Sequence, residues 1–173
     1  MLNKIKIGQS IVLSTAERKL AHFVAKNRNS RNRHFNVTNL KISAADAATV
    51  DLEGVCGEIA FCKLFNAYPD LDTDRTPPHP LFDCVVSGLR IDVKTTKWDS
   101  GKLIVDARKG NKTNGVDYYA LRTGQFPGPY TFRGFIAREK LIIPSKLGTL
   151  ANYQTYNSYI ADQSELTDDL SLF

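Results

Sequence analysis

The stretch from Phe82 to Thr96 constrains the fold of this chain more than any other segment. Polar and apolar residues alternate on either side of Ser87-Gly88, as in two short strands. Serine and glycine suit the two central positions of a hairpin turn, and such a turn fixes which residues face each other. The predicted pairs are Val86 with Leu89, Val85 with Arg90, Cys84 with Ile91 and Asp83 with Asp92.

The two faces of this hairpin differ in chemistry. Because side chains alternate along a strand, one face is apolar and is expected to be core: Phe82, Cys84, Val86, Leu89, Ile91 and Val93. The other face carries Asp83, Val85, Arg90, Asp92, Lys94 and Thr96. Two opposed carboxylates at roughly 5 Å repel each other, and a divalent cation such as Mg²⁺ relieves that repulsion. The alternative is an ordinary strand with an exposed acid and an exposed base.

A lysine and a glutamate extend this acidic pair. Lys94 points to the same side as the second aspartate, where its ammonium would stabilise a pentacovalent phosphate or orient an attacking water. Glu58 lies in a helix predicted over residues 49–65, at the margin of its apolar stripe. We expect it to be a further metal ligand or a base that orients water; a solvated helix glutamate is the alternative. Gly54 and Gly57 in this helix indicate close approach to another chain segment or space for a ligand.

The remaining patterns predict a single α/β domain over residues 1–173, with helices before a mixed sheet. Ser14 and Glu17 have the spacing of a capping box, which predicts a first helix over residues 15–27. The basic residues 27–34 lack periodicity and are expected to form an exposed arm. A proline-rich loop is expected at 66–81, before the hairpin. After the hairpin, further strands are expected at 103–105, 116–121 and 130–136, and a short helix at 137–141. The domain divides into a basic N-terminal helix and arm (1–48), a core (49–141) and a C-terminal extension with an acidic tail (142–173).

Charge is distributed unevenly along this chain, whose net charge is +5. Residues 1–41 hold nine lysines and arginines against one acid, whereas residues 161–173 hold four acids and no lysine or arginine. A basic front suits a polyanionic partner such as nucleic acid, although a merely solvated basic surface fits the charge equally well. No apolar run is long enough to cross a bilayer, so we expect a cytoplasmic protein with reduced core cysteines (Cys56, Cys62 and Cys84).

Basic and polar residues around the hairpin are candidates for contacts with nucleic-acid phosphates. Phosphate contacts position a nucleic acid without specifying its sequence. The candidates are Arg31, Arg33, Arg90, Thr96, Lys97, Lys102, Arg108, Lys109 and Lys112. Trp98 lies among them, and it either stacks on a base or packs against the protein.

In this order, Glu58, Asp83, Asp92 and Lys94 resemble the motif of the PD-(D/E)XK phosphodiesterase superfamily. The resemblance covers residues 51–96. It identifies Glu58 with the helix acid of the motif and Asp83 with the metal-binding aspartate. Asp92 and Lys94 then correspond to the second acid and the lysine, and the carbonyl of Val93 to the backbone metal ligand. Phe82 stands where the motif has proline, and Asp92 replaces the more frequent glutamate. The short segment 107–115 replaces the usual crossover helix.

This resemblance implies a restriction-endonuclease-like mixed β-sheet flanked by helices, here with an N-terminal helical extension. It also implies an endonuclease that depends on Mg²⁺, with Mn²⁺ as a substitute, and cleaves DNA, including branched or nicked DNA. The motif order is similar to that of Holliday-junction resolvases and small phage nucleases. Resolvases cut two strands with two sites, so the resemblance implies a homodimer. A phage-encoded protein of this kind is expected in the host cytoplasm. The alternatives are a non-catalytic nucleic-acid-binding module on the same scaffold and a phage protein-interaction factor that uses the acidic tail.

Overall fold

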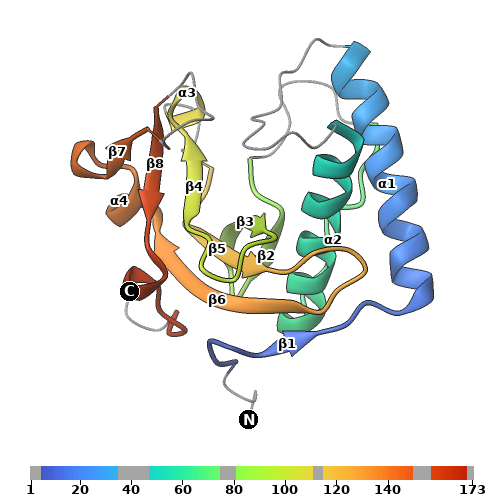
Figure 1. The fold of residues 1–173 in the computed structure, drawn as a ribbon, viewed down its shortest axis with the longest axis horizontal. Coiled ribbons are helices and arrows are strands. Elements are labelled where there is room, and N and C mark those ends of the chain that lie inside the picture. The colour runs from blue at the N-terminus through green and yellow to red at the C-terminus, as the bar shows by residue number, and fades with distance from the viewer. Residues whose placement is uncertain (1–4, 35–46, 75–80, 111–114, 150–156, 171–173) are drawn as a thin grey trace.

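The computed structural model describes residues 5–34, 47–74, 81–110, 115–149 and 157–170. The expected α/β class is confirmed, with a mixed sheet and helices (Figure 1). The principal elements are β1 (Ser10–Ile11), α1 (Thr15–His34), α2 (Ala47–Phe65), β2 (Cys84–Val86), β3 (Leu89–Thr96), β4 (Leu103–Asp106), α3 (Ala107–Gly110), β5 (Tyr118–Thr123), β6 (Tyr130–Ala137), α4 (Arg138–Leu141), β7 (Leu147–Gly148) and β8 (Ser158–Ala161). Two 3₁₀ turns, Pro144–Lys146 and Gln163–Glu165, complete the list. No helix among the described residues is long and apolar enough to span a membrane.

The hairpin of β2 and β3 has the predicted register. Cys84 pairs with Ile91, Val85 with Arg90 and Val86 with Leu89. Ser87 and Gly88 form the turn with φ angles of 52° and 83°. Positive φ at both central positions is the signature of a type I′ turn, whose twist matches that of the strands it joins.

The described strands form two sheets. The larger sheet has the order β1-β6-β5-β3-β2, in which β3 runs parallel to β5 and the other neighbours are antiparallel. The smaller sheet has the order β4-β8-β7. A parallel pair needs a crossover, and here β4 and the four-residue α3 provide it. Within the described part of segment 107–115, the helix has four residues, Ala107–Gly110.

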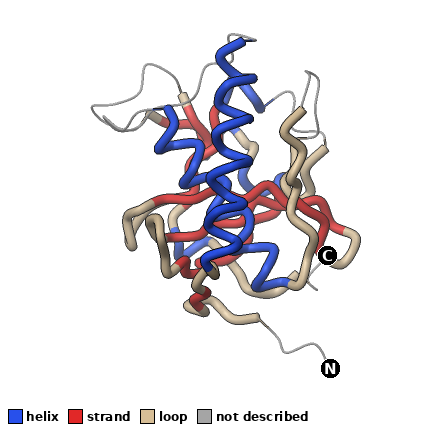
Figure 2. The backbone as a smooth tube through the Cα atoms, turned by 90° about the vertical axis from the view of Figure 1, so that its right-hand side faces the viewer, coloured by secondary structure: helices blue, strands red, loops and turns tan. Residues whose placement is uncertain are grey.

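The apolar face of the hairpin is core, as predicted, with one exception. Cys84, Val86, Ile91 and Val93 are buried together with Phe61 of α2 and with side chains of β5 and β6. Figures 1 and 2 show α2 lying against this side of the sheet, with α1 outside it. The exception is Phe82, which packs half-buried into a different cluster, between the larger sheet and β4 and β8. Phe82 precedes the first residue of β2, so strand alternation does not set its direction.

The first helix is seven residues longer than expected, because α1 continues to His34. Residues 27–34 were expected to form an exposed arm, and that expectation is wrong. Asn27 and Ser30 donate side-chain hydrogen bonds to the carbonyls four residues earlier, and Asn29 donates to Asp51 of α2. The bonds within α1 and the contact of Asn29 with α2 stabilise a helical segment whose sequence lacks amphipathic periodicity.

Candidate active site

Asp83 lies against the edge of β3, directly beside Asp92. Its N–H donates to the carbonyl of Ile91 at 2.8 Å, and its carboxylate accepts the N–H of Val93 at 2.7 Å. Asp83 thus contacts the residues on both sides of Asp92. Because β2 begins only at Cys84, this carboxylate takes the place of a strand neighbour for β3. Asp83 is in the predicted place, but its carboxylate also has a structural partner in the Val93 N–H.

Asp92 and Lys94 form a close ion pair on the opposite face of β3 from the apolar core. Lys94 Nζ lies 2.5 Å from Asp92 Oδ1, and the two side chains are 32% and 15% exposed. Burial favours the neutral amine, but the carboxylates of Asp92 and Asp83 outweigh it and raise the pKa of Lys94. Lys94 is therefore an ammonium at neutral pH, which can donate hydrogen bonds and stabilise negative charge but cannot act as a general base.

Glu58 reaches the same region from α2 and is held by an arginine of α1. Arg28 Nη1 donates to Glu58 Oε2 at 2.9 Å, and the two side chains are only 10% and 16% exposed. Arg28 also donates to the carbonyls of Asp70 and Asp72. The sequence analysis did not identify Arg28 as a site residue, because it placed Arg28 in an exposed arm. Its partner Glu58 lies thirty positions later, beyond the reach of any local pattern.

The electrostatics of Asp83 show that the three acids converge. Its pKa lies well above the ordinary range, first because the carboxyl is desolvated, and next because the charges of Glu58 and Asp92 lie close to it. Lys94 and the Val93 N–H offset only part of this effect. The structure therefore brings together Glu58, Asp83, Asp92 and Lys94, and their surroundings favour the neutral form of the Asp83 carboxyl.

The donor chemistry of this cluster fits a hard divalent cation. Carboxylate and carbonyl oxygens are the ligands that Mg²⁺ and Mn²⁺ accept, and the carboxylates of Glu58 and Asp92 lie close enough to the desolvated Asp83 carboxyl to raise its pKa further. In the present side-chain arrangement, no group of three or more acidic, histidine or cysteine side chains within the described residues is placed to hold a metal. Lys94 occupies one oxygen of Asp92, and Arg28 occupies one oxygen of Glu58. A cation would therefore be held chiefly by Asp83 and Asp92, with Glu58 and the Val93 carbonyl as further ligands.

Four of the predicted phosphate-binding cations have acidic partners within the protein. The ion pairs are Arg31 with Asp74, Arg90 with Asp117, Lys102 with Asp162 and Arg108 with Asp106. Lys97 lies over the ring of Trp98, and Thr96 accepts the Trp98 N–H. The side chains of Arg33 and Lys109, and the whole of Lys112, lie outside the described residues.

Arg90 is at the far end of β3 from Lys94, although the two side chains share a strand face. There it lines an open recess with Asp117, Tyr118, Arg138 and Glu139. None of the four clustered residues lines this recess, so it is separate from the candidate site.

The acidic tail makes ion pairs with the body of the protein. Asp162 pairs with Lys102, Glu165 with Lys146, and Asp168 with Lys6. Part of the tail's charge is thus used in intramolecular contacts.

A comparison with protein families places most of the chain in one family. A family model described only as a family of unknown function (DUF5843) matches residues 3–124. The chain belongs to this family. The DUF5843 match begins before α1 and ends just after β5, so it includes Glu58, Asp83, Asp92 and Lys94 and excludes β6 to β8. No curated protein and no solved structure matches the chain.

Proposed function

We propose that this protein is a divalent-metal-dependent nuclease that hydrolyses phosphodiester bonds in DNA. The convergence of two aspartates and an ammonium at the edge of β3, with Glu58 reaching them from α2, is the observation that carries the proposal. Carboxylates bind the cation that phosphodiester hydrolysis uses, and a fixed ammonium stabilises the charge that develops on the phosphate. The mixed sheet, with β2 antiparallel and β5 parallel to β3, is compatible with a restriction-endonuclease-like fold.

Each clustered residue has a role that follows from its contacts. Mg²⁺ at Asp83 and Asp92 would lower the pKa of a bound water and neutralise phosphate charge. Lys94, kept protonated by the same carboxylates, donates hydrogen bonds to phosphate oxygens or to the attacking water. Arg28 is a positioning residue, because it fixes the direction of the Glu58 carboxylate without lying in the cluster itself.

The decisive experiment measures cleavage of supercoiled plasmid and of four-way-junction DNA with Mg²⁺ or Mn²⁺. We expect Asp92→Asn and Lys94→Met each to reduce the rate at least about 100-fold, because each removes a charge from the transition state. Asp74→Asn is the matched control: it changes an aspartate whose side chain is 90% exposed in a surface ion pair with Arg31, and such a pair contributes little to stability. Equal activity of wild type and Asp92→Asn would refute the proposed site.

A second candidate, a non-catalytic nucleic-acid-binding module, is supported by the ion pairs themselves. Asp92 and Glu58 each have a cationic partner within 3 Å, so both carboxylates are neutralised without a metal. A module of this kind would bind DNA with salt-sensitive affinity. It would show no cleavage with either cation, and Asp92→Asn would leave its binding unchanged.

A further inference from the structure

Trp98 is an exposed aromatic side chain held beside a cation. It is the only tryptophan of the chain, and it follows the end of β3 by two residues. Its exposed fraction is 64%, and Lys97 Nζ lies 4.8 Å from the centre of its ring. Trp98 is therefore mostly exposed and is not part of the core. An exposed indole offers a large flat apolar face for a ligand.

The turn that carries Trp98 is tightly closed. The N–H of Gly101 donates to the Trp98 carbonyl at 2.8 Å, and Thr96 Oγ1 accepts the Trp98 N–H at 3.4 Å. A Cβ atom at Gly101 would lie 2.4 Å from the Thr96 methyl group. Only glycine therefore allows this turn to close against the end of β3.

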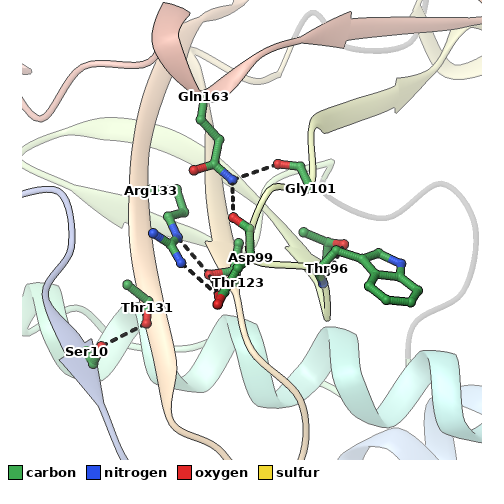
Figure 3. A network of polar contacts seen from close by, with 9 residues as sticks. Ser10, Thr96, Asp99, Gly101, Thr123, Thr131, Arg133 and Gln163 are labelled. Carbon is green, nitrogen blue, oxygen red and sulfur yellow. Dashed lines mark hydrogen bonds and ion pairs between the residues drawn. The ribbon is translucent and has the colours of Figure 1, made fainter.

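Side chains from other elements hold the same turn (Figure 3). Arg133 of β6 donates to the Asp99 carboxylate at 2.9 Å, and Gln163 donates to the carbonyls of Asp99 and Gly101 at 2.6 and 2.9 Å. The Arg133 contact also neutralises the acid next to Trp98. The ring thus projects from a supported turn, with the ammonium of Lys97 4.8 Å from its centre.

We propose that Trp98 is a stacking platform for an unpaired nucleic-acid base, with Lys97 contacting a neighbouring phosphate. This rests on the proposed function, and it names the substrate class as DNA with an unpaired or single-stranded region beside the scissile phosphate. Every base offers a π-face that an aromatic ring can cover, whereas the bases of an intact duplex are stacked on one another and cannot reach a side chain. Trp98 lies four residues after Lys94, which is at most about 13 Å along the extended chain.

The surroundings of Trp98 favour a nucleic acid over a protein partner. Protein interfaces bury a contiguous cluster of apolar and aromatic residues. Among the described residues, the other exposed large apolar side chains belong to other segments, such as Phe23 on α1 and Tyr68 after α2. Lys97 lies beside the tryptophan ring, and a phosphate backbone complements its charge.

Because Trp98 is the only tryptophan, its fluorescence reports stacking directly. The protein is titrated in EDTA, where no cleavage occurs, with a single-stranded oligothymidylate and with an abasic oligonucleotide of the same length. We expect the oligothymidylate to quench the emission and the abasic strand, which has the same phosphates, to leave it nearly unchanged. Equal quenching by the two strands, or none by either, would overturn the proposal.

Variants test the energetic contribution of the ring by anisotropy of a labelled oligonucleotide. Trp98→Ala is expected to weaken single-strand binding about 5- to 150-fold, the range measured for one stacked base, and Trp98→Phe to retain most of the affinity. Phe23→Ala, which removes an equally exposed aromatic ring on α1, should change nothing. A loss of affinity as large for Phe23→Ala as for Trp98→Ala would refute the platform.

Cleavage assays separate this inference from the proposed function. Trp98→Ala should raise the KM for DNA containing a single-stranded region and leave kcat within about threefold, whereas Asp92→Asn abolishes cleavage and leaves quenching intact. Quenching without any metal-dependent cleavage by wild type would refute the nuclease but support the platform. Cleavage with an unchanged KM in Trp98→Ala would refute the platform but support the nuclease.

Discussion

Arg28 shows how individual charges organise the candidate site. It is 8% exposed, and its guanidinium contacts the Glu58 carboxylate and two carbonyls of the segment that follows α2. A buried charge needs such partners, because desolvation without them costs several kcal/mol. Arg28 therefore links α1, α2 and the chain leading to Asp83. Composition indicated that the basic N-terminal segment is a surface for a polyanion. Part of its positive charge instead lies inside the protein, in ion pairs with acidic side chains.

We predict that Arg28→Met destabilises the protein by about 3–5 kcal/mol, because Glu58 is left buried without its counter-charge. Urea unfolding measures the change. The double variant Arg28→Met with Glu58→Gln should recover a large part of the loss, since it removes the orphaned charge as well. If the double variant is as unstable as the sum of the two single variants, the two side chains are not coupled.

A second residue-scale prediction concerns Glu53, whose carboxylate accepts the Phe126 N–H at 2.9 Å and the Tyr130 hydroxyl at 3.3 Å. Burial raises the pKa of Glu53, and these hydrogen bonds offset only part of that effect. The folded state then binds a proton more readily than the unfolded state, so ionisation of Glu53 reduces stability as pH rises above about 4.5. Glu53→Gln should remove this loss, so the variant gains stability relative to wild type between about pH 4 and pH 7.

Glu17 is the matched control for Glu53, because its pKa is shifted in the opposite direction. Desolvation raises the pKa of Glu17, but hydrogen bonds from Lys63 and Ser14 outweigh it, so the pKa is lowered overall. Ionised Glu17 therefore stabilises the folded state, and Glu17→Gln should lose stability relative to wild type over the same pH range. Unfolding free energies measured at several pH values would contradict this explanation if both variants changed in the same direction.

Helices and strands differ in how much of their structure local sequence determines. The β2–β3 hairpin could be predicted to the residue, because strand alternation and a Ser-Gly turn are local signals. The last two turns of α1 could not, because they depend on contacts with α2 and with residues 70–72. The short strands β1, β7 and β8 have two to four residues each, which is too few for a periodic pattern.

The candidate site shows the same division. The positions of Asp83, Asp92 and Lys94 follow from the hairpin, so they could be predicted from the sequence. The pairing of Glu58 with Arg28, and the use of the Asp83 carboxylate by the Val93 N–H, join residues that no local pattern relates. The complete burial of Arg122, whose Nη2 donates to the Tyr130 carbonyl, had no sequence signal either.

Helix α2 provides a matched test of packing against the site strand. A Cβ atom at Gly57 would lie 1.8 Å from Thr95 Oγ1, whereas nothing lies within 4 Å of one at Gly54. Gly57→Ala should destabilise the protein by about 1–3 kcal/mol through overpacking, and Gly54→Ala should stabilise it by up to about 1 kcal/mol through helix propensity. Thermal unfolding distinguishes the two variants, and a stabilising Gly57→Ala would disprove the close contact between α2 and β3.

At the scale of the whole molecule, the larger sheet joins the N-terminal strand β1 to β6, more than 100 residues later in the sequence. β6 lies between β1 and β5, and it contributes Phe132 and Phe135 to the core beneath the hairpin. The DUF5843 match, residues 3–124, stops before this strand. The matched segment therefore carries the candidate site but lacks a strand and two core aromatic residues that support it.

We predict that a chain ending at residue 124 does not fold cooperatively, because it lacks β6 and leaves apolar surface of β5 exposed. Circular dichroism and denaturant unfolding provide the measurement. A separate polypeptide of residues 125–173, added to the truncated chain, should restore a cooperative transition. A sharp transition in the truncated chain alone would show that residues 1–124 are an independent folding unit.

The place of β6 also determines when this protein can become functional during its synthesis. Within the described strands, β1 hydrogen-bonds only to β6, so the N-terminal strand has no partner until residues 130–137 have left the ribosome. The acids and the lysine of the candidate site emerge much earlier. An incomplete nascent chain would thus carry all four residues without the finished sheet that orients them, and the proposed nuclease would acquire activity only late in translation.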